Sequence, residues 1–246
     1  GTIQTNVTAG FSIITYTGTG GAGTIAHGLG VAPRWVLVKR RDGTGWSWYN
    51  QHAEFLSGSD GSVYTNSTAL GDDDSTHWND TAPTSTVFSV GTKNNINQSG
   101  IDFMAIVIAN VNGSVRAGTY QGNGNVHGPF IFTGFKPRCV WITRYNTTGE
   151  NTSWKTSTTM ALGPDNSAQS GSGSNHGNPI EHNIKLDSTD NGGAEVASQD
   201  KIHFFAQGFA PFTTDGKSNG DGHHYVYVAW AREPSVTTTK LLTTAF

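Results

Sequence analysis

The sequence predicts an all-β protein built from two tandem antiparallel β-sandwich repeats. Three observations lead to this prediction. The 246 residues include 32 Gly together with 7 Trp, 7 Tyr and 12 Phe, and only 13% of them are charged. Turn-forming residues are thus accompanied by enough aromatic residues to build a core. The chain also repeats itself over a domain-sized period, and no window of a dozen residues has the 3.6-residue apolar spacing of a helix.

The internal repeat begins with two blocks that recur at one offset. Thr15–Gly20 returns at Thr119–Gly124, and Gly30–Arg40 returns at Gly134–Arg144, so matching residues are 104 positions apart. A period this long exceeds the 20–50 residues of a solenoid unit, so each copy is expected to be a domain.

The closing blocks of the two copies are further apart. Gly100–Ala109 pairs with Gly222–Ala231 at an offset of 122, so the second copy is longer. The polar run Gly163–Asn178 is the expected insertion, and any function particular to this protein is expected there. The predicted domains are residues 1–112 and 113–234, followed by a tail at 235–246.

Strands are expected where β-branched and aromatic residues gather between clusters of Gly, Asn, Asp or Ser. In the first repeat these segments are Phe11–Thr17, Trp35–Arg41, Trp46–Asn50, Ser62–Thr65, Thr86–Val90 and Asp102–Asn110. In the second repeat they are Ser114–Gln121, Pro129–Thr133, Arg138–Tyr145, Thr152–Thr156, Ile184–Asp187, Lys201–Phe205 and Tyr225–Ala231. Six or seven strands per copy suit an antiparallel sandwich.

Two local features refine these strands. Phe103–Ala109 and Tyr225–Ala231 are nearly continuous apolar runs, so both are expected to lie centrally in their sheets. Gly30 and Gly134 each stand three residues before a proline and are expected to adopt the positive φ of a tight turn that leads into a core strand.

Composition and charge exclude several classes of protein. No run of apolar residues approaches the 18 that a membrane-spanning helix needs, so we expect no membrane insertion. Lys and Arg are dispersed in a chain of net charge −3, which argues against nucleic acid as a partner. The single Cys139 excludes an internal disulfide framework and a cysteine zinc site, and it is expected to be a buried strand residue.

Several blocks of sequence occur in a defined order. They are GFSIITYTGTG from Gly10, HGLGVAP from His27, VKRR from Val38, THWNDTAPT from Thr76, VFSVG from Val87, GPFIFTGFKP from Gly128 and YVYVAWARE from Tyr225. Together they resemble a repeat common in tail-fibre and other structural proteins of marine bacteriophages, over roughly residues 9–234. The resemblance implies a concanavalin-like or jelly-roll sandwich displayed on a virion. It implies no reaction, because that family has no agreed catalytic residues.

Aromatic residues near polar loops are the candidates for sugar binding. Trp46 and Trp48 alternate with Ser47 and share one face of a strand, and Trp154 is the approximate counterpart in the second copy. A flat ring beside amide and carboxylate groups can stack on a pyranose while its hydroxyls are hydrogen-bonded. The predicted ligand-binding residues are Trp46, Trp48, Trp78, Asn79 and Trp154. The alternative that Trp46 and Trp48 are core residues stays open.

Three adjacent carboxylates form the densest acidic cluster. Asp72, Asp73 and Asp74 are oxygen ligands of the kind that Ca²⁺ takes, so they are the candidate metal site, although they lack the EF-hand spacing. A solvated acidic loop is the competing interpretation. We expect no other cofactor.

The leading functional hypothesis is a non-enzymatic component of the virion surface, either a tail fibre or a decoration-type adhesin that binds host polysaccharide weakly. Its partners would be further copies of itself, by analogy with fibres a trimer, and other virion proteins. A purely structural role without a ligand fits nearly as well. The competing class is a polysaccharide lyase or glycosidase on a jelly-roll scaffold. For a lyase, His203, Arg116, Tyr120 and Gln121 are the first residues to consider. A glycosidase would need two facing carboxylates, and the glutamates form no obvious pair in the sequence.

Overall fold

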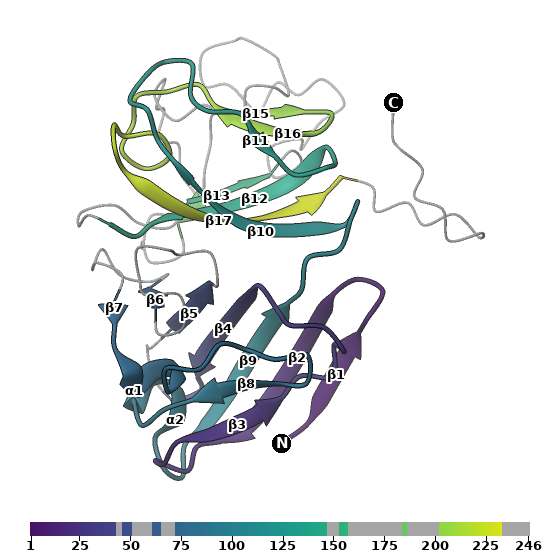
Figure 1. Ribbon diagram of the computed structural model, residues 1–246, viewed down its shortest axis with the longest axis vertical. Helices are drawn as coiled ribbons and strands as arrows, with labels where there is room; N and C mark the ends of the chain where they lie inside the picture. Colours follow the sequence, from purple (N-terminus) through teal and green to yellow (C-terminus); the bar gives the residue numbers. More distant parts are fainter. Residues whose placement is uncertain are drawn as a thin grey trace. The chain divides into compact units, whose positions relative to one another are not determined.

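The protein is an all-β chain that divides into two compact units, Gly1–Val111 (unit 1) and Asn112–Phe246 (unit 2). The computed structural model describes residues 1–42, 46–50, 61–64, 72–146, 153–156, 184–185 and 202–232. The division falls one residue before the predicted boundary between 112 and 113, and the tail at 235–246 lies outside the described residues. All described strand pairs are antiparallel (Figure 1).

Unit 1 consists of a large and a small sheet. The large sheet has the strand order β1 (Ile3–Asn6), β2 (Phe11–Thr17), β9 (Asp102–Ile108), β4 (Trp35–Arg40), β5 (Trp46–Asn50), β6 (Gly61–Tyr64) and β7 (Asp72–Asp73). The small sheet pairs β3 (Gly23–Ala26) with β8 (Val87–Val90). The apolar strand β9 lies between β2 and β4, in the central position that its sequence predicts (Figure 1).

The core of unit 1 is built from both of its sheets. The large sheet contributes alternating residues such as Tyr16, Val36 and Phe103, and the small sheet contributes Phe88 and Val90. Alternation is required because successive side chains of a strand point to opposite faces.

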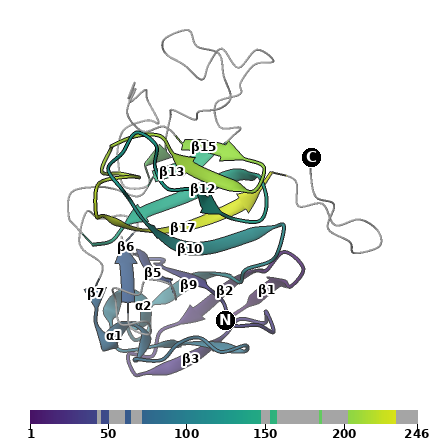
Figure 2. The ribbon, with the colours of Figure 1, turned by 45° about the horizontal axis from the view of Figure 1, so that its top comes forward.

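Unit 2 also has two sheets. The larger one has the order β10 (Val115–Gln121), β17 (His224–Ala231), β12 (Pro137–Arg144), β13 (Ser153–Thr156) and β14 (Ile184–Lys185). The smaller one has the order β11 (Ile131–Phe132), β16 (Gly208–Pro211) and β15 (Ile202–Phe205). Figure 2 shows the smaller sheet with β15 lying over the larger sheet with β12 and β17. The core of the unit includes Ile202, Phe204 and Phe209 from the smaller sheet and Val140 and Tyr225 from the larger sheet.

A tyrosine that packs against the core occupies the same position in each unit, fully buried as Tyr16 and partly buried as Tyr120. The Tyr16 hydroxyl donates to the carbonyl of Ile96 at 2.6 Å, and the Tyr120 hydroxyl donates to the carbonyl of Ser218 at 2.7 Å. Each ring stacks at 15° on an aromatic ring of the neighbouring central strand, with centroid separations of 5.2 and 4.9 Å. The donors are 104 positions apart and the acceptors 122, which are the two offsets of the sequence repeat.

A buried asparagine forms the second shared feature. Asn97 Nδ2 donates to the carbonyls of Gly91 and Gly21, both at 2.7 Å, and its Oδ1 accepts from the Thr19 amide at 2.9 Å. In unit 2, Asn219 Nδ2 donates at 2.7 Å to the carbonyls of Thr213 and Asn125, and its Oδ1 accepts from the Asn123 amide at 3.0 Å. Every member of the first set matches a member of the second at the repeat offsets, so one hydrogen-bonded framework is built twice.

The predicted turn glycines have the expected backbone. Gly30 has φ 74° and Gly134 has φ 83°, in the left-handed region that favours glycine, and β4 and β12 begin a few residues later. Cys139 lies in β12 as predicted, but it is half-buried rather than buried and sits at an irregularity in the pairing with β17.

The elements that the sequence did not indicate are all short. Two single-turn helices, α1 (Ser75–Trp78) and α2 (Asn94–Asn97), lie in unit 1 and are too brief to show helical periodicity. Strands β1, β3, β7 and β16 have two to four residues each, and tertiary pairing rather than local pattern defines them. Within the described part of the chain, no helix is long and apolar enough to cross a membrane.

Candidate functional site

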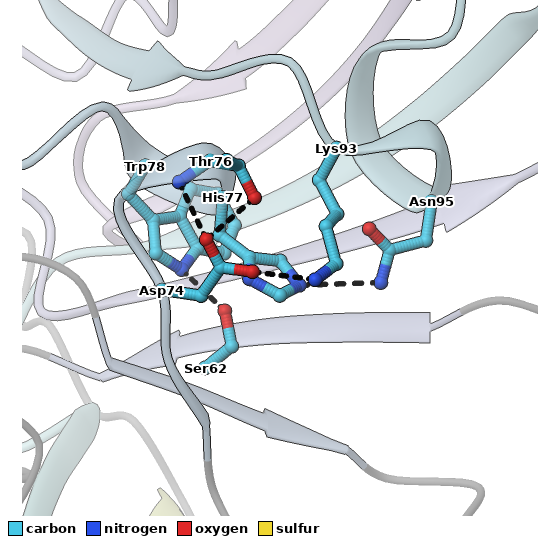
Figure 3. Close-up of polar contacts among 7 residues, drawn as sticks. All are labelled: Ser62, Asp74, Thr76, His77, Trp78, Lys93 and Asn95. Atoms are coloured by element: carbon cyan, nitrogen blue, oxygen red, sulfur yellow. Dashed lines mark hydrogen bonds and ion pairs between the residues drawn. The ribbon is translucent and has the colours of Figure 1, made fainter.

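A polar cluster gathers around α1 and the segment that leads into α2 in unit 1 (Figure 3). Asp74 is the N-cap of α1 and accepts hydrogen bonds from the amide of Thr76 at 2.8 Å and from its hydroxyl at 2.6 Å. Its other carboxylate oxygen pairs with Lys93 Nζ at 2.5 Å. The hydrogen bond from Lys93, followed by those from Thr76, holds the pKa of Asp74 well below its usual range, so this carboxyl is ionised.

His77 is the buried member of the cluster. Its side chain is fully buried, and its Nε2 is 3.3 Å from Nδ2 of Asn95. The main chain of α1 is also tied to the following segment, because the amide of Gly91 donates to the His77 carbonyl at 2.6 Å and the amide of Lys93 donates to the Thr76 carbonyl at 2.9 Å.

An open depression of about 540 Å³ lies beside this cluster. Its lining residues are Thr76, Thr92, Lys93, Asn94 and Asn95. Their side chains carry hydroxyl, amide and ammonium groups, and Thr92 and Asn94 are exposed. Since Asp74 balances the charge of Lys93, the depression offers many hydrogen-bonding groups without a strong net charge.

The structure corrects the prediction for Trp78. The indole was expected to be available for stacking on a sugar, but only 2% of it is exposed and it belongs to the core of unit 1. Its Nε1 donates to the buried Ser62 hydroxyl at 2.7 Å (Figure 3). The polar sequence around Trp78 conceals this because α1 turns the indole and the His77 ring inward, while Ser75, Thr76 and Asn79 remain exposed. Asn79 is exposed and ends α1 with φ 54°, as a C-cap whose amide donates to the Ser75 carbonyl.

The other predicted site residues are described through their backbone only. Trp46 and Trp48 lie in β5 opposite Lys39 and Leu37, and Trp154 lies in β13 opposite Trp141. Asp72 and Asp73 form β7, where they pair with β6. The side chains of these five residues, and the whole run Gly163–Asn178, lie outside the described residues.

The predicted calcium site receives no support from Asp74, whose carboxylate caps a helix and pairs with Lys93. In the portion of the chain that is described, no group of three or more His, Cys, Asp or Glu side chains could hold a metal ion.

Two of the residues considered for lyase chemistry lie on different faces, since Tyr120 packs against the core of unit 2 and His203 does not. Tyr120 is committed to the shared framework through the Ser218 carbonyl. His203 is on the outer face of β15, since it alternates with the core residues Ile202 and Phe204, and its ring stacks on Phe212.

Sequence reasoning missed Lys93 and Asn95. Lys93 is 19 residues from Asp74, and no local spacing links an ammonium in one loop to a carboxylate in another. The sequence did offer one signal, because Lys93 is the only lysine in the polar run Gly91–Gly100 that begins where the block VFSVG ends.

Comparison with known proteins gives one family. No curated protein and no solved structure matches the chain. Residues 1–234, which include unit 1, most of unit 2 and the polar cluster, match a family described as a domain of unknown function, DUF7483. Because this match spans far more than half of the sequence, the chain belongs to the DUF7483 family.

Proposed function

We propose that this protein is a non-enzymatic structural component of a bacteriophage virion, a tail-fibre or decoration-type adhesin that binds host-surface glycan weakly. The ordered sequence blocks that resemble phage tail-fibre repeats support the virion role. In this proposal each unit is a jelly-roll or concanavalin-like sandwich. The paired antiparallel sheets around a common core are consistent with such a scaffold.

The depression beside Asp74 and Lys93 is the single observation that supports glycan binding. Thr92, Lys93, Asn94 and Asn95 present donors and acceptors to an open space of about 540 Å³. A sugar is recognised through several hydroxyls at once, and hydroxyl, amide and ammonium groups around a shallow space are complementary to them.

The charge of the depression favours neutral sugars. Lys93 is paired with Asp74, and the nearby Arg40 is paired with Asp42 at 2.6 Å. Neither cation therefore provides an uncompensated charge for a sulfate or uronate group. Because each new hydrogen bond replaces one to water, a single site would be weak, and a homo-oligomer would supply the avidity.

A glycan array with the full-length chain in its native oligomeric state tests the binding. We expect binding to neutral glycans, and we expect the double variant Thr92→Ala/Asn94→Ala to weaken it at least fivefold. Thr24→Ala is the matched control, since this exposed threonine lies on β3 outside the depression. An array without any bound glycan would overturn the adhesin proposal. New reducing ends or unsaturated uronates after incubation with polysaccharides would replace it with the enzymatic alternative.

The virion role has a separate test. Antibodies against the chain, applied to purified phage particles of the source, should label the particle surface in immunogold electron microscopy. Particles that carry no label and whose proteins lack this chain by mass spectrometry would contradict the virion assignment.

A further inference from the structure

The strands β4 and β12 end in arginines at equivalent positions of the repeat, Arg40 and Arg144. Nη1 of Arg40 donates to the carbonyl of Asn94 at 3.1 Å, and Nη1 of Arg144 donates to the carbonyl of Gly216 at 3.5 Å. These two acceptors are 122 positions apart, which is the second repeat offset. Each arginine therefore ties the end of its strand to the segment that precedes the last strand of its unit. In unit 2 we call Asp215–Gly222 the closing segment.

The other partners of the two arginines differ. Arg40 also donates to Oε1 of Gln98 at 2.5 Å and forms an ion pair with Asp42 at 2.6 Å. At the matching positions of unit 2 the sequence has Gly220 in place of Gln98 and Asn146 in place of Asp42. Neither the amide acceptor nor the carboxylate is repeated, so different groups surround Arg144.

The imidazole of His223 replaces the missing glutamine. Its Nδ1 is 3.3 Å from Nη1 of Arg144. A Cβ atom at Gly220 would be 2.2 Å from this same nitrogen, so the ring occupies space that a side chain at position 220 would need. Unit 1 has Ile101 at the position of His223, and this isoleucine packs against the core. The glycine and the histidine of unit 2 thus belong together.

The contact between Arg144 and His223 requires a neutral imidazole. A guanidinium group has only donors and stays charged, so Nδ1 of His223 must accept. Protonation of Nδ1 would remove this acceptor and place two cations side by side. Because Arg144 is only 7% exposed, water screens their repulsion poorly. Histidine is the side chain that ordinarily changes its charge between pH 5 and 8.

The partners of Arg40 do not change their charge in this range. The amide of Gln98 does not titrate. The hydrogen bond from Arg40 lowers the pKa of Asp42, so this carboxylate stays ionised at pH 5. The two units therefore hold equivalent segments with the same arginine, but only the contact in unit 2 depends on a titratable acceptor.

Other charged groups near His223 do not compensate a second cation. Among the described contacts, none joins a carboxylate to the His223 ring. The carboxylate of Asp215 accepts from the amide of Lys217 at 2.8 Å, and Asp221 is exposed. His224 is the next residue of the chain, and its ring lies edge-on to Tyr145. The remaining titratable groups on the closing segment and the adjoining strands are Lys217, Tyr120 and Tyr225.

We propose that Arg144 and His223 form an acid-sensitive switch that holds the closing segment of unit 2 at neutral pH and releases it as the pH falls toward 5. The segment contains Asn219 of the buried framework and the Ser218 carbonyl that accepts from Tyr120. Its release therefore loosens unit 2, whereas the equivalent segment of unit 1 stays in place. The switch does not depend on glycan binding, because the depression in unit 1 contains neither residue.

Hydrogen exchange of the full-length chain, measured by NMR at pH 7.5 and pH 5, provides the test. Protection factors are corrected for the intrinsic pH dependence of exchange. The amides of Asn219 and Asn97 are a matched pair, since each donates to the carbonyl four residues earlier, at 2.8 and 2.9 Å. We expect the protection of Asn219 to fall at least tenfold between the two pH values and that of Asn97 to fall less than threefold.

Two variants assign the effect to one ring. His223→Gln provides a neutral acceptor that does not titrate, so the protection of Asn219 should differ less than threefold between the two pH values. His224→Gln is the matched control, because it removes the adjacent histidine and leaves Arg144 and His223 unchanged. This control should keep the loss of protection seen in the wild type.

The proposal has clear contrary results. Protection of Asn219 that does not fall in the wild type, an equal fall at Asn97, or the same fall in His223→Gln would each overturn it. The nitrogen chemical shifts of the His223 ring give a second measurement that needs no variant. We expect Nδ1 to be unprotonated at pH 7.5 and protonated at pH 5, and a proton on Nδ1 at pH 7.5 would overturn the proposal.

Discussion

The buried asparagine of the repeated framework allows a quantitative test of the fold. The change is Asn97→Ala, which removes two donated hydrogen bonds of 2.7 Å and one accepted bond of 2.9 Å. Asn97 is 2% exposed, so water does not readily replace these bonds. A net contribution of about 0.5–1.5 kcal/mol for each bond gives a loss of about 1.5–4.5 kcal/mol in the free energy of unfolding. That is a large part of the roughly 5–15 kcal/mol that stabilises a typical domain.

Urea denaturation, followed by tryptophan fluorescence and circular dichroism, measures this loss. Asn219→Ala should produce a loss at least as large, because its side chain makes the equivalent three bonds in unit 2 and a fourth to Asn123 Oδ1 at 3.0 Å. Asn94→Ala is the matched control, since this asparagine is exposed, and a change within about 0.5 kcal/mol is expected.

The variant Asn97→Asp sharpens the test. It keeps an acceptor for the Thr19 amide but directs carboxylate oxygens at two carbonyl oxygens, which raises the pKa of the new carboxyl. Protonation restores a donor, so its destabilisation should decrease as the pH falls toward 4. A loss below about 1 kcal/mol for either alanine variant, or an Asn97→Asp variant as stable as the wild type at neutral pH, would refute the role of the framework.

Three further predictions concern unit 1. His27 is fully buried, and both of its ring nitrogens are hydrogen-bonded. Burial lowers the pKa of His27 in the folded protein. The neutral ring therefore stabilises the fold above the unfolded pKa of about 6.5, and this stabilisation is lost as the pH falls. The thermal midpoint of the wild type should thus decrease between pH 7.5 and pH 5, and that of His27→Gln should decrease less. An equal decrease in the two proteins would contradict this. Trp78→Phe should cost about 1–3 kcal/mol in urea titrations, because it leaves the buried Ser62 hydroxyl without its indole donor, whereas a neutral effect would argue against that bond. Gly91→Ala should destabilise by about 1–3 kcal/mol in the same titrations, because its Cβ would lie 2.2 Å from the carbonyl oxygen of Thr76, and unchanged stability would show that this approach relaxes freely.

Local chemistry explains what could be predicted for the two units. The strands β2, β4, β9, β10, β12 and β17 contain β-branched and aromatic residues between turn residues, and all lie close to their predicted bounds. The turn at Gly30 was predictable because a positive φ is a property of a single residue. The repeat offsets also pointed to matching tyrosines, although their acceptors could not be named.

The candidate site was less predictable because it depends on contacts across the chain. The polar neighbours of Trp78 suggested exposure, but the indole is in the core because the single turn of α1 directs it there. The ion pair between Asp74 and Lys93 joins two loops. The sequence of each loop indicates only that it is polar and does not predict its partner. A periodic pattern reports which face of an element is buried, whereas it does not report which side chains of two distant elements meet.

The sequence by itself determined the all-β class, the repeat and most of the long strands, because alternation and turn residues act over a few neighbouring positions. The tertiary structure alone decided which side chains meet at the surface. Phe130 and Phe205 are 75 positions apart and come together only because β11 and β15 flank β16 in one sheet. Strand order is a long-range outcome of packing, so the pattern within a single strand does not predict it.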